Sequence, residues 1–382
     1  MRQAFDIAVI GGGIAGASVA SELASSGNHV VLLEMESQPG YHTTGRSAAV
    51  FAPSYGPAPI RALTRASEAF FQTPPDRFAD HPLVTPRGAL MIARDDQSES
   101  LENLVREVSD TLPVSVLDEA QLLEINPLLR RGYATAAMLD NSARDIDVNA
   151  LHQGFLRRFK AEGGSIAVDA EVLALSHGSS GWHLDTRAGE FSAEIIVNAA
   201  GAWADQVGQM AGAERIGLVP KRRTIATIEA PGQIEFDHMP ATIDVDEDFY
   251  LKPDAGKLLI SPADETPSEP CDAQPEEIDI AICVDRIEKS FDLSVRRIEN
   301  KWAGLRSFVS DKCPVAGYSQ VAEGVYWLAG QGGYGIQSAP ALARLAAAQI
   351  LDKPVPQNII DEGLDVADLA PGRFAADANQ ST

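Results

Sequence analysis

Residues 6–34 decide the fold and read DIAVIGGGIAGASVASELASSGNHVVLLE. The short apolar run at 7–10 is typical of a buried strand, and the small and apolar spacing of 15–24 predicts a buried helix. Residues 29–34 predict a second buried strand after a helix stop at Gly-Asn. Because strand–helix–strand crossovers are right-handed, the two strands are expected to be parallel, as in a Rossmann-like unit.

The glycines of GGGIAG, residues 11–16, match the G-x-G-x-x-G pattern after a strand and at the start of a helix. Gly11 permits the tight turn, Gly13 lets the backbone approach a pyrophosphate, and Gly16 allows close helix packing. Glu34 ends the second strand, where a carboxylate can accept both hydroxyls of an adenosine ribose. The pattern predicts a dinucleotide site and leaves NAD and FAD open; the alternative is a glycine turn in an ordinary α/β domain.

Composition excludes several classes of protein. The 382 residues exceed the size of a single core, so two lobes or domains are expected. A net charge of −23, from 31 Lys and Arg against 54 Asp and Glu, disfavours binding to nucleic acid. Three cysteines without C-x-x-C spacing predict neither a disulfide framework nor a metal site, and favour a cytoplasmic setting. No secretory signal or membrane span is expected.

A second glycine-rich turn, GQGGYG at 330–335, follows a predicted strand at 324–329 and precedes a predicted helix at 336–351. No strand ending in an acid comes after it, so it is not a complete dinucleotide unit. It is either a plain turn or a receptor for a polar part of a ligand held elsewhere. One dinucleotide unit with a distant glycine turn, and no second unit for NAD(P)H, favours an extended FAD whose electrons come from a small substrate.

The remaining segments predict a discontinuous fold. Residues 57–129 are irregular apart from a possible strand at 89–93 and a helical charge pattern at 97–108, while 165–175 and 182–186 are expected to be strands of a smaller sheet. We predict an α/β protein in which a Rossmann-like FAD-binding domain carries an inserted, α+β, antiparallel-sheet substrate domain. The predicted FAD-binding domain comprises 1–75, 142–212 and 307–382, and the substrate-binding domain 76–141 and 213–306.

Several segments together resemble the glycine/D-amino acid oxidase family of FAD enzymes. They are residues 6–34, the loop GYHTTGRSAAVF at 40–51, IIVNAAGAWAD at 195–205, WAGLRSF at 302–308 and GQGGYGIQ at 330–337. With PKRR at 220–223 and FYLKPDAG at 249–256, the chain most resembles bacterial FAD-dependent D-amino acid dehydrogenases of the D-arginine dehydrogenase type. The resemblance covers nearly the full length.

The resemblance implies that the loop after the second strand folds over the flavin, where small residues admit the backbone to a planar ring. A floppy surface loop is the alternative. Cys313 does not align with the cysteine that attaches flavin in some relatives, so non-covalent FAD is expected; His42 is a weak candidate for a flavin contact. The predicted cofactor-binding residues are Gly11, Gly13, Ile14, Ala15, Gly16, Glu34, Thr44, Gly45, Ser47, Ala48, Gly201, Gly332, Gly335 and Ile336.

For the substrate, the resemblance implies that Arg223 and Arg306 anchor a carboxylate, since the planar guanidinium pairs with it through two hydrogen bonds. Tyr250 would add a phenolic donor, Tyr55 would form part of a gate over the flavin, and the backbone of Gly333 would accept the substrate amine. From the sequence alone each arginine could equally form a surface ion pair. Glu247 is a candidate for orienting an arginine, or a solvated loop acid.

Two positions depart from the D-arginine type. The acid that would hold a basic side chain becomes Ala89, within PRGAL, and an active-site histidine becomes Val50. Without the acid, a buried guanidinium of the substrate would be unpaired, which is costly. We therefore predict a preference for neutral, apolar side chains over D-arginine.

The predicted function is oxidative deamination of D-amino acids, in which a hydride passes from Cα to the flavin and the imine is hydrolysed to a 2-oxo acid and ammonia. The alternative is an oxidase or dehydrogenase of secondary amines, such as N-methyl or cyclic amino acids. A flavin-bearing sensor and an NAD-dependent dehydrogenase are further readings. A quinone or O2 would reoxidise the flavin, and no metal ion is expected.

Overall fold

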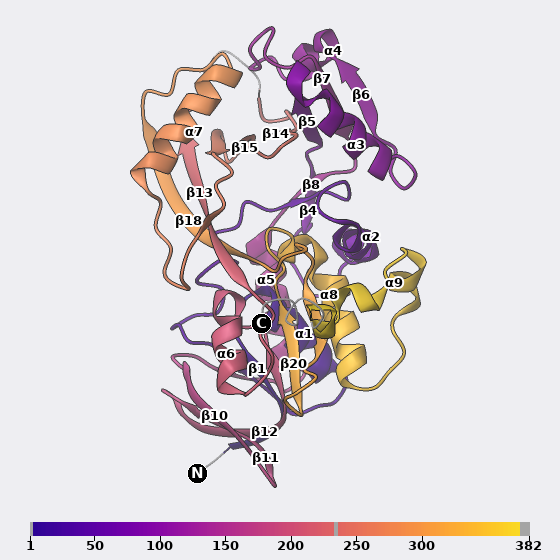
Figure 1. The fold of residues 1–382 in the computed structure, drawn as a ribbon, viewed down its shortest axis with the longest axis vertical. Helices are drawn as coiled ribbons and strands as arrows, with labels where there is room; N and C mark the ends of the chain where they lie inside the picture. The colour runs from indigo at the N-terminus through magenta and orange to yellow at the C-terminus, as the bar shows by residue number, and fades with distance from the viewer. Residues whose placement is uncertain (1–2, 233–235, 375–382) are drawn as a thin grey trace, which may run out of the picture.

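The first sheet is built around β1 (Gln3–Ile10), which pairs in parallel with β2 (Val30–Leu33) on one side and β12 (Gly189–Asn198) on the other. The structure is a computed structural model that describes residues 3–232 and 236–374. β20 (Val325–Ala329) extends the parallel arrangement beside β12. This sheet lies in the lower half of the molecule in Figure 1. The predicted parallel strand–helix–strand unit is confirmed.

Four helices of the described chain bury a common apolar core against one face of this sheet. α1 (Ile14–Ser25) contacts α5 (Val148–Ala161) and α8 (Gly335–Ile350), and α2 (Ala58–Gln72) packs on α8. Because α1 is rich in Gly, Ala and Ser, its neighbours can approach its backbone closely.

The strands after α5 differ from the prediction, which placed 165–175 and 182–186 in a smaller separate sheet. β9 (Ser165–Ala167) pairs in parallel with β2, and β10 (Val172–Gly178) with β11 (Gly181–Thr186) forms a hairpin on β12. All belong to the first sheet. The reason is the length of β12: its first half pairs with β11 and its last residues pair with β20. β19 (Val315–Tyr318) closes this side by pairing with β20.

The second sheet forms the upper half of the molecule and is antiparallel except where β5 and β14 run in parallel. Its longest strands, β13 and β18, pair with each other over ten positions. The strands are β5 (Ala89–Ala93), β6 (Ser115–Asp118), β7 (Ala136–Asp140), β13 (Val219–Ile228), β14 (Ala241–Asp244), β15 (Tyr250–Asp254), β16 (Lys257–Ser261), β17 (Thr266–Pro267) and β18 (Ile298–Phe308). The mixed α/β fold class is confirmed.

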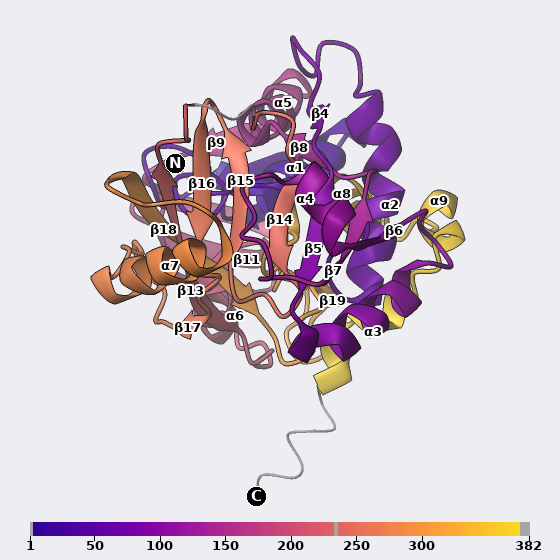
Figure 2. The same cartoon turned by 90° about the horizontal axis from the view of Figure 1, so that it is seen from above.

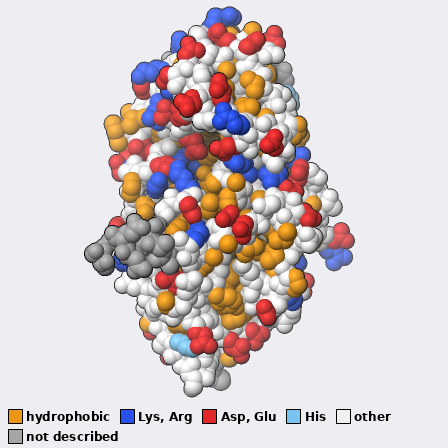
Figure 3. All heavy atoms as spheres, turned by 45° about the vertical axis from the view of Figure 1, so that its right-hand side comes forward, with side chains coloured by type: hydrophobic (Ala, Val, Ile, Leu, Met, Phe, Trp, Pro, Cys, Tyr) orange, Lys and Arg blue, Asp and Glu red, His pale blue; other side chains and the backbone are white. Residues whose placement is uncertain are grey.

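Helices cover the outer face of the second sheet, as the view from above shows (Figure 2). α4 (Glu119–Ile125) and α7 (Glu277–Ser290) bury apolar residues against it. α3 (Ser98–Val108) packs on the opposite face, where its Leu101 joins Met91 of β5 and Met138 of β7. Since side chains alternate along a strand, the other residues of β5, β14 and β15 face inward, toward the first sheet. Acidic and basic side chains are interspersed on the face drawn in Figure 3.

α2 lies in the stretch 57–129, which the sequence pattern predicts to be irregular at these positions. In α2 the prolines occupy Pro57 at the cap and Pro59 in the first turn, where a helix needs no backbone donor. The core-facing residues of α2, among them Ile60, Leu63 and Phe71, recur at helical spacing.

The chain enters the two sheets alternately. A small three-stranded sheet of β3 (Val50–Phe51), β8 (Arg144–Ile146) and β4 (Val84–Pro86) lies where the chain passes between them. The short elements that complete the described chain are α6 (Ala204–Met210), α9 (Gln357–Asp361), η1 (Asp95–Gln97), η2 (Gly201–Trp203), η3 (Val366–Leu369) and η4 (Pro371–Phe374). The domain boundaries stay a prediction, and their ends at 1–2 and 375–382 lie outside the described residues.

The packing of α1 on β1 predicts a marked effect of Gly16→Ala. A Cβ atom at Gly16 would lie 1.8 Å from the carbonyl oxygen of Gly11, so the helix must shift. We expect the free energy of unfolding to fall by about 1–3 kcal/mol, as for other overpacked cores, with a lower midpoint in thermal unfolding. Gly178→Ala is the control, because an added Cβ there meets nothing within 4 Å. Equal midpoints for the two variants would contradict the packing argument.

Candidate active site

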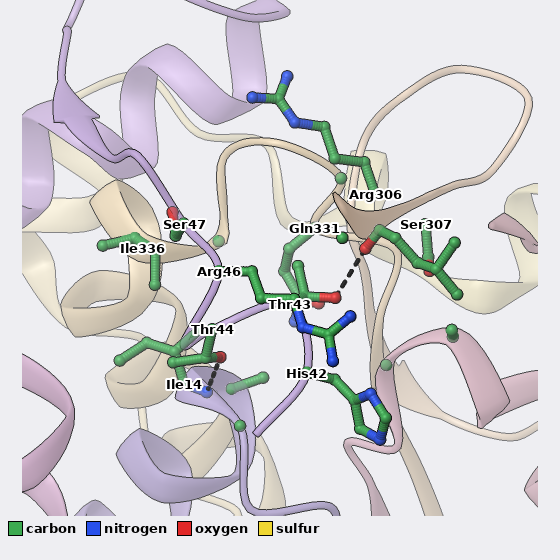
Figure 4. A pocket seen from close by; sticks show the side chains of 18 of the residues that line it. Ile14, His42, Thr43, Thr44, Arg46, Ser47, Arg306, Ser307, Gln331 and Ile336 are labelled. Carbon is green, nitrogen blue, oxygen red and sulfur yellow. Dashed lines mark hydrogen bonds between the residues drawn. The ribbon is translucent and has the colours of Figure 1, made fainter. Parts of the chain in front are cut away.

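The turn between β1 and α1 is shaped for backbone approach. Gly11 has φ +104°, and a Cβ atom there would lie 2.4 Å from the carbonyl oxygen of Ala199 on the neighbouring strand end. The first helical amide, that of Ile14, donates to the Thr44 hydroxyl at 2.9 Å (Figure 4). The helix therefore starts beside the loop that follows β2, and its amino terminus favours an anion.

Glu34 lies just beyond β2 and is buried. Its Oε2 accepts a hydrogen bond from the Gly12 amide at 2.8 Å, and its Oε1 accepts one from the Glu36 amide at 2.9 Å. Burial raises the pKa of Glu34 above its usual value, although these hydrogen bonds oppose the shift. Each carboxylate oxygen has a further lone pair, so the carboxylate can still accept ribose hydroxyls.

The sequence analysis missed His152, a buried residue of α5 that supports the same turn. Its Nε2 lies 2.8 Å from the carbonyl oxygen of Gly12, which can only accept, so Nε2 carries the proton. Burial lowers the pKa of His152, and the ring is neutral at pH 7. The sequence around His152 is that of an ordinary amphipathic helix and does not predict this contact, because the partner lies 140 residues away in sequence.

The loop at 40–49 is held against the second sheet. The Thr43 hydroxyl donates to the Leu305 carbonyl at 2.7 Å (Figure 4). Arg46 Nη1 donates to the Ala303 carbonyl at 3.0 Å. The Trp302 indole in turn donates to the Arg46 carbonyl at 3.0 Å. Arg46 also pairs with Asp272. The loop is thus anchored to β18 and is not a floppy connection.

A large cavity lies between the two sheets, with an empty volume of about 2280 Å³ counted with its open mouth. Its lining extends from Gly11 in the first glycine turn to Gly333 in the second, so both turns border one continuous cavity. It contains the predicted site residues Gly11, Gly13, Ile14, Ala15, Glu34, Thr44, Ser47, Ala48, Tyr55, Gly201, Arg223, Tyr250, Arg306, Gly332, Gly333, Gly335 and Ile336.

Two predicted cofactor-binding residues, Gly16 and Gly45, are not among the residues that line the cavity. Both lie where the backbone folds tightly on itself. A Cβ atom at Gly45 would lie 2.5 Å from the Gly40 carbonyl oxygen, as one at Gly16 would approach Gly11. Because neither glycine has a Cβ atom, the backbone can form the tight turns that lie beside the cavity.

The second sheet supplies the wall at one end of the cavity. The inward residues of β5, β14 and β15 line it: Ala89, Met91, Ala241, Ile243, Tyr250 and Lys252. Pairing places Met91, Ile243 and Tyr250 side by side across three strands. This wall is apolar except for Tyr250 and the buried Lys252, whose ammonium lies 2.8 Å from Asp145 Oδ1. Asp145 is shared with Arg87 at 2.6 Å.

Arg306 extends from β18 away from Ile14 and Thr44, which mark the glycine-turn end of the cavity (Figure 4). It forms no ion pair with a carboxylate of the described residues. Burial works to lower the pKa of Arg306, but Tyr55, Tyr250 and Glu247 outweigh it and hold the pKa above its usual range. Arg306 is therefore a charged guanidinium with capacity to bind an anion.

Tyr250 and Tyr55 lie close to this guanidinium. The Tyr250 hydroxyl is buried and has no hydrogen-bond partner among the described residues, which is costly unless a ligand supplies one. The Tyr55 hydroxyl donates to Glu247 Oε2 at 3.1 Å. Burial, reinforced by the charge of Glu247, raises the pKa of Tyr55 to about 12, so Tyr55 stays protonated.

Gly333 lies directly against Arg306. A Cβ atom at Gly333 would lie 2.7 Å from Arg306 Nη1, so a residue with a side chain would displace the guanidinium. Gly332, with φ +54°, packs against the ring of Phe308 in the same way. The second glycine-rich turn is therefore not a plain surface turn, since it fits against Arg306 and the cavity.

Arg223 is buried and lines the cavity, and its guanidinium has two partners within the protein. Its Nε donates to the Asp264 carbonyl at 2.9 Å, and its Nη2 lies 3.3 Å from Glu265 Oε1. The sequence analysis did not identify Glu265, because a run of acids after a strand is typical of a solvated loop.

The other candidates have local partners. His42 Nε2 lies 2.9 Å from Glu36 Oε1, and its ring packs against Trp203. Cys313 is buried outside the cavity lining, and burial raises the pKa of its thiol to about 11. Within 3–232 and 236–374, no group of three or more His, Cys, Asp or Glu could hold a metal ion. None of the helices in those ranges is both long and apolar enough to cross a membrane.

These residues fit FAD on structural grounds: glycine turns that exclude a Cβ, a helix amino terminus for a pyrophosphate, a carboxylate for a ribose, and a cavity reaching the second glycine turn. The fold and the cavity thus define a dinucleotide-binding protein.

The family is shown by residues 6–349, which match the model of the FAD-dependent oxidoreductases called DAO, and the chain belongs to this family. The glycine oxidase of Geobacillus kaustophilus (strain HTA426) is 24% identical over 366 residues, covering 91% of this chain and 93% of the relative. The predictions of the family and of FAD are confirmed. Non-covalent attachment stays a prediction.

Solved structures share the fold. A glycine oxidase from Geobacillus kaustophilus superimposes with a TM-score of 0.81 at 22% identity, covering 97% of this chain and 99% of that one. The L-proline dehydrogenase from P. horikoshii gives 0.78 at 21%, covering 98% and 99%. The L-α-glycerophosphate oxidase from Mycoplasma pneumoniae, solved with FAD bound, gives 0.82 at 17%, covering 94% and 98%.

The neutral state of His152 predicts a pH-dependent contribution to stability. The unfolded histidine binds a proton near pH 6.5, whereas the folded one does so only at lower pH. The unfolded state therefore binds more protons in this window, and stability falls as the pH falls below about 6.5. His152→Gln should be less stable at pH 7, by about 1 kcal/mol for the altered hydrogen bond, and should lose less stability between pH 7 and pH 5.

The measurement is thermal or denaturant unfolding of both proteins across this pH range. His177→Gln is the control, since His177 is exposed on β10, and it should keep the pH dependence of the parent protein. If His152→Gln loses as much stability on acidification as the parent does, His152 does not contribute in this way.

Proposed function

We propose that the chain oxidises D-amino acids with neutral, apolar side chains to imines, which water converts to 2-oxo acids and ammonia. One observation carries the proposal: the Arg306 guanidinium and the Tyr250 hydroxyl face the same cavity, and the described residues offer neither an ion-pairing carboxylate to the first nor any hydrogen-bond partner to the second. A substrate carboxylate satisfies both, because it accepts two parallel bonds from Arg and one from a phenol.

FAD, when bound, supplies the acceptor for the two electrons of a hydride. In the substrate, the Cα–H bond breaks with its electron pair leaving as hydride, and the nitrogen lone pair forms the C=N bond of an iminium. Water then adds to this carbon, and ammonium leaves to give the 2-oxo acid.

The chain orients the substrate for this step and excludes water. Arg306 and Tyr250 fix the carboxylate, and Arg223 adds a second guanidinium from β13. The Gly333 carbonyl can accept an N–H of the substrate amine, since Gly333 lies against Arg306. Fixing these two ends, with the substrate side chain against the apolar wall as the third contact, leaves one orientation for Cα, which is the entropic contribution that positioning makes to catalysis. Tyr55, protonated and bonded to Glu247, covers this end of the cavity.

The preference for a neutral side chain follows from the wall of the second sheet. Ala89 and Ile243 of this wall are apolar, as are Val50 and Ala52, which line the same cavity from β3 and the residue after it. The charged residue of the wall is Lys252. Asp145 already pairs with Lys252 and Arg87, so it offers little to a further cation. A substrate guanidinium here would be desolvated beside an ammonium, which is unfavourable.

The proposal predicts the order of substrates. The value of kcat/KM should be at least about tenfold higher for D-leucine than for D-arginine, L-leucine or sarcosine, a difference of about 1.4 kcal/mol. The measurement is steady-state turnover with an artificial electron acceptor, together with release of ammonia and 2-oxo acid. Sarcosine or proline as the best substrate would overturn the proposal in favour of secondary-amine oxidation.

A single substitution tests the wall. Ala89→Glu places a carboxylate in the apolar surface and should raise kcat/KM for D-arginine relative to D-leucine by about tenfold or more, as expected for a charge-assisted hydrogen bond. Ala89→Gln is the matched control, because it fills the same space without the charge. If Glu and Gln shift the ratio equally, the side chain of the substrate does not lie beside Ala89.

A further inference from the structure

A short segment, residues 261–265, binds the guanidinium of Arg223 through a hydrogen bond and an ion pair. We call these five residues the clamp segment. The Asp264 carbonyl accepts from Arg223 Nε, and the Glu265 carboxylate pairs with Nη2. The described residues make no hydrogen bond to Nη1. Arg223 therefore presents one nitrogen without a protein partner, on a side chain that lines the cavity and is only 4% exposed.

The clamp segment is itself fixed to β13. The Asp264 carboxylate accepts from the Thr224 amide at 2.6 Å and from its hydroxyl at 3.0 Å, and Ser261 Oγ donates to the Thr224 carbonyl at 2.6 Å. Arg286 Nη1 donates to the Pro262 carbonyl at 2.7 Å. The segment is thus tied to the residue next to Arg223, so it cannot move without disturbing the strand.

The backbone conformation of Ala263 turns the clamp segment and is energetically unfavourable. It has φ +51°, in the left-handed region that a residue with a Cβ adopts at about 1–2 kcal/mol, and it lines the cavity. This turn lets the two following residues reach the same guanidinium, one through its carbonyl and one through its carboxylate. Strained residues of this kind persist where the surrounding structure holds them, often at functional sites.

Glu265 is the centre of a cluster of cations. Lys221 Nζ lies 2.8 Å and Lys312 Nζ 3.5 Å from its Oε2, while Arg223 occupies Oε1. Burial works to raise the pKa of Glu265, but the Lys221 hydrogen bond and the charges of Lys312, Lys221 and Arg223 outweigh it and lower the pKa. Glu265 is therefore a carboxylate that remains ionised, and the cluster keeps a surplus of positive charge.

We propose that Glu265 is a positioning residue, which holds Arg223 so that Nη1 is free to bind the substrate carboxylate. Lys221 and Lys312 keep Glu265 in place, and the Asp264 carbonyl fixes the other edge of the guanidinium. Glu265 does not touch the substrate; it acts through Arg223. The inference rests on the proposed role of Arg223 as a carboxylate anchor.

The test is binding of isocaproate, the D-leucine skeleton without its amine, to the FAD-loaded protein, followed by the visible spectrum of the flavin. Glu265→Gln should weaken binding about tenfold, as expected for loss of one charge-assisted hydrogen bond. Arg223→Met should weaken it at least as much. The double variant should bind no more weakly than Arg223→Met alone, because Glu265 has no other route to the ligand.

Glu269→Gln is the control, since Glu269 is an exposed acid four residues further along, and it should bind isocaproate as the parent does. If Glu265→Gln does not fold or retain FAD, Glu265→Asp keeps the charge on a shorter stem and should weaken binding by a smaller factor. Unchanged binding in the Glu265 variant, or a further loss in the double variant, would overturn the inference while leaving the anchor intact. Unchanged binding in Arg223→Met would instead remove the anchor itself.

Discussion

The contact between Gly16 and the Gly11 carbonyl is the constraint on which the rest of the structure depends. It places the start of α1 directly at the end of β1, so that the amino terminus of the helix lies at the edge of the sheet where the parallel strands end. Glu34, Thr44 and His152 all bond to this turn, from β2, the following loop and α5. Three separate elements are thus fitted around one backbone turn, which sets one end of the cavity.

Two positively charged side chains, Arg223 and Arg306, lie at the other end of the cavity. The loop at 40–49 ties the first sheet to β18, and β18 carries Arg306. Arg223, by contrast, comes from β13 with its partners already in place. The pairing of β13 with β18 brings both guanidiniums to one cavity. Two nitrogens of Arg223 are held by the clamp segment, whereas Arg306 forms no ion pair with a carboxylate of the described residues.

The sequence could predict the features that depend on local pattern. The glycine turn with its strands and helix, the acid at Glu34 and the strand at 324–329 all have the periodicity or spacing that their structure requires. The sequence could not show where β10 and β11 lie. This hairpin joins the first sheet because β12 is long enough to pair with β11 as well, and the length of β12 was not known in advance. It also missed His152 and Glu265, whose roles come from partners distant in sequence. α2 was missed because prolines suggest loops unless their position in the first turn is known.

The central claim is that a substrate carboxylate, held by guanidiniums at one end of the cavity, orients Cα for oxidation. The most direct measurement mixes the FAD-loaded protein without oxygen with D-leucine and, separately, with isopentylamine, which has the same skeleton but no carboxylate, and follows loss of the visible flavin absorbance. The account predicts rapid bleaching by D-leucine and bleaching by isopentylamine slower by at least about a hundredfold, since two charge-assisted hydrogen bonds are missing. Equal rates with both compounds would contradict it.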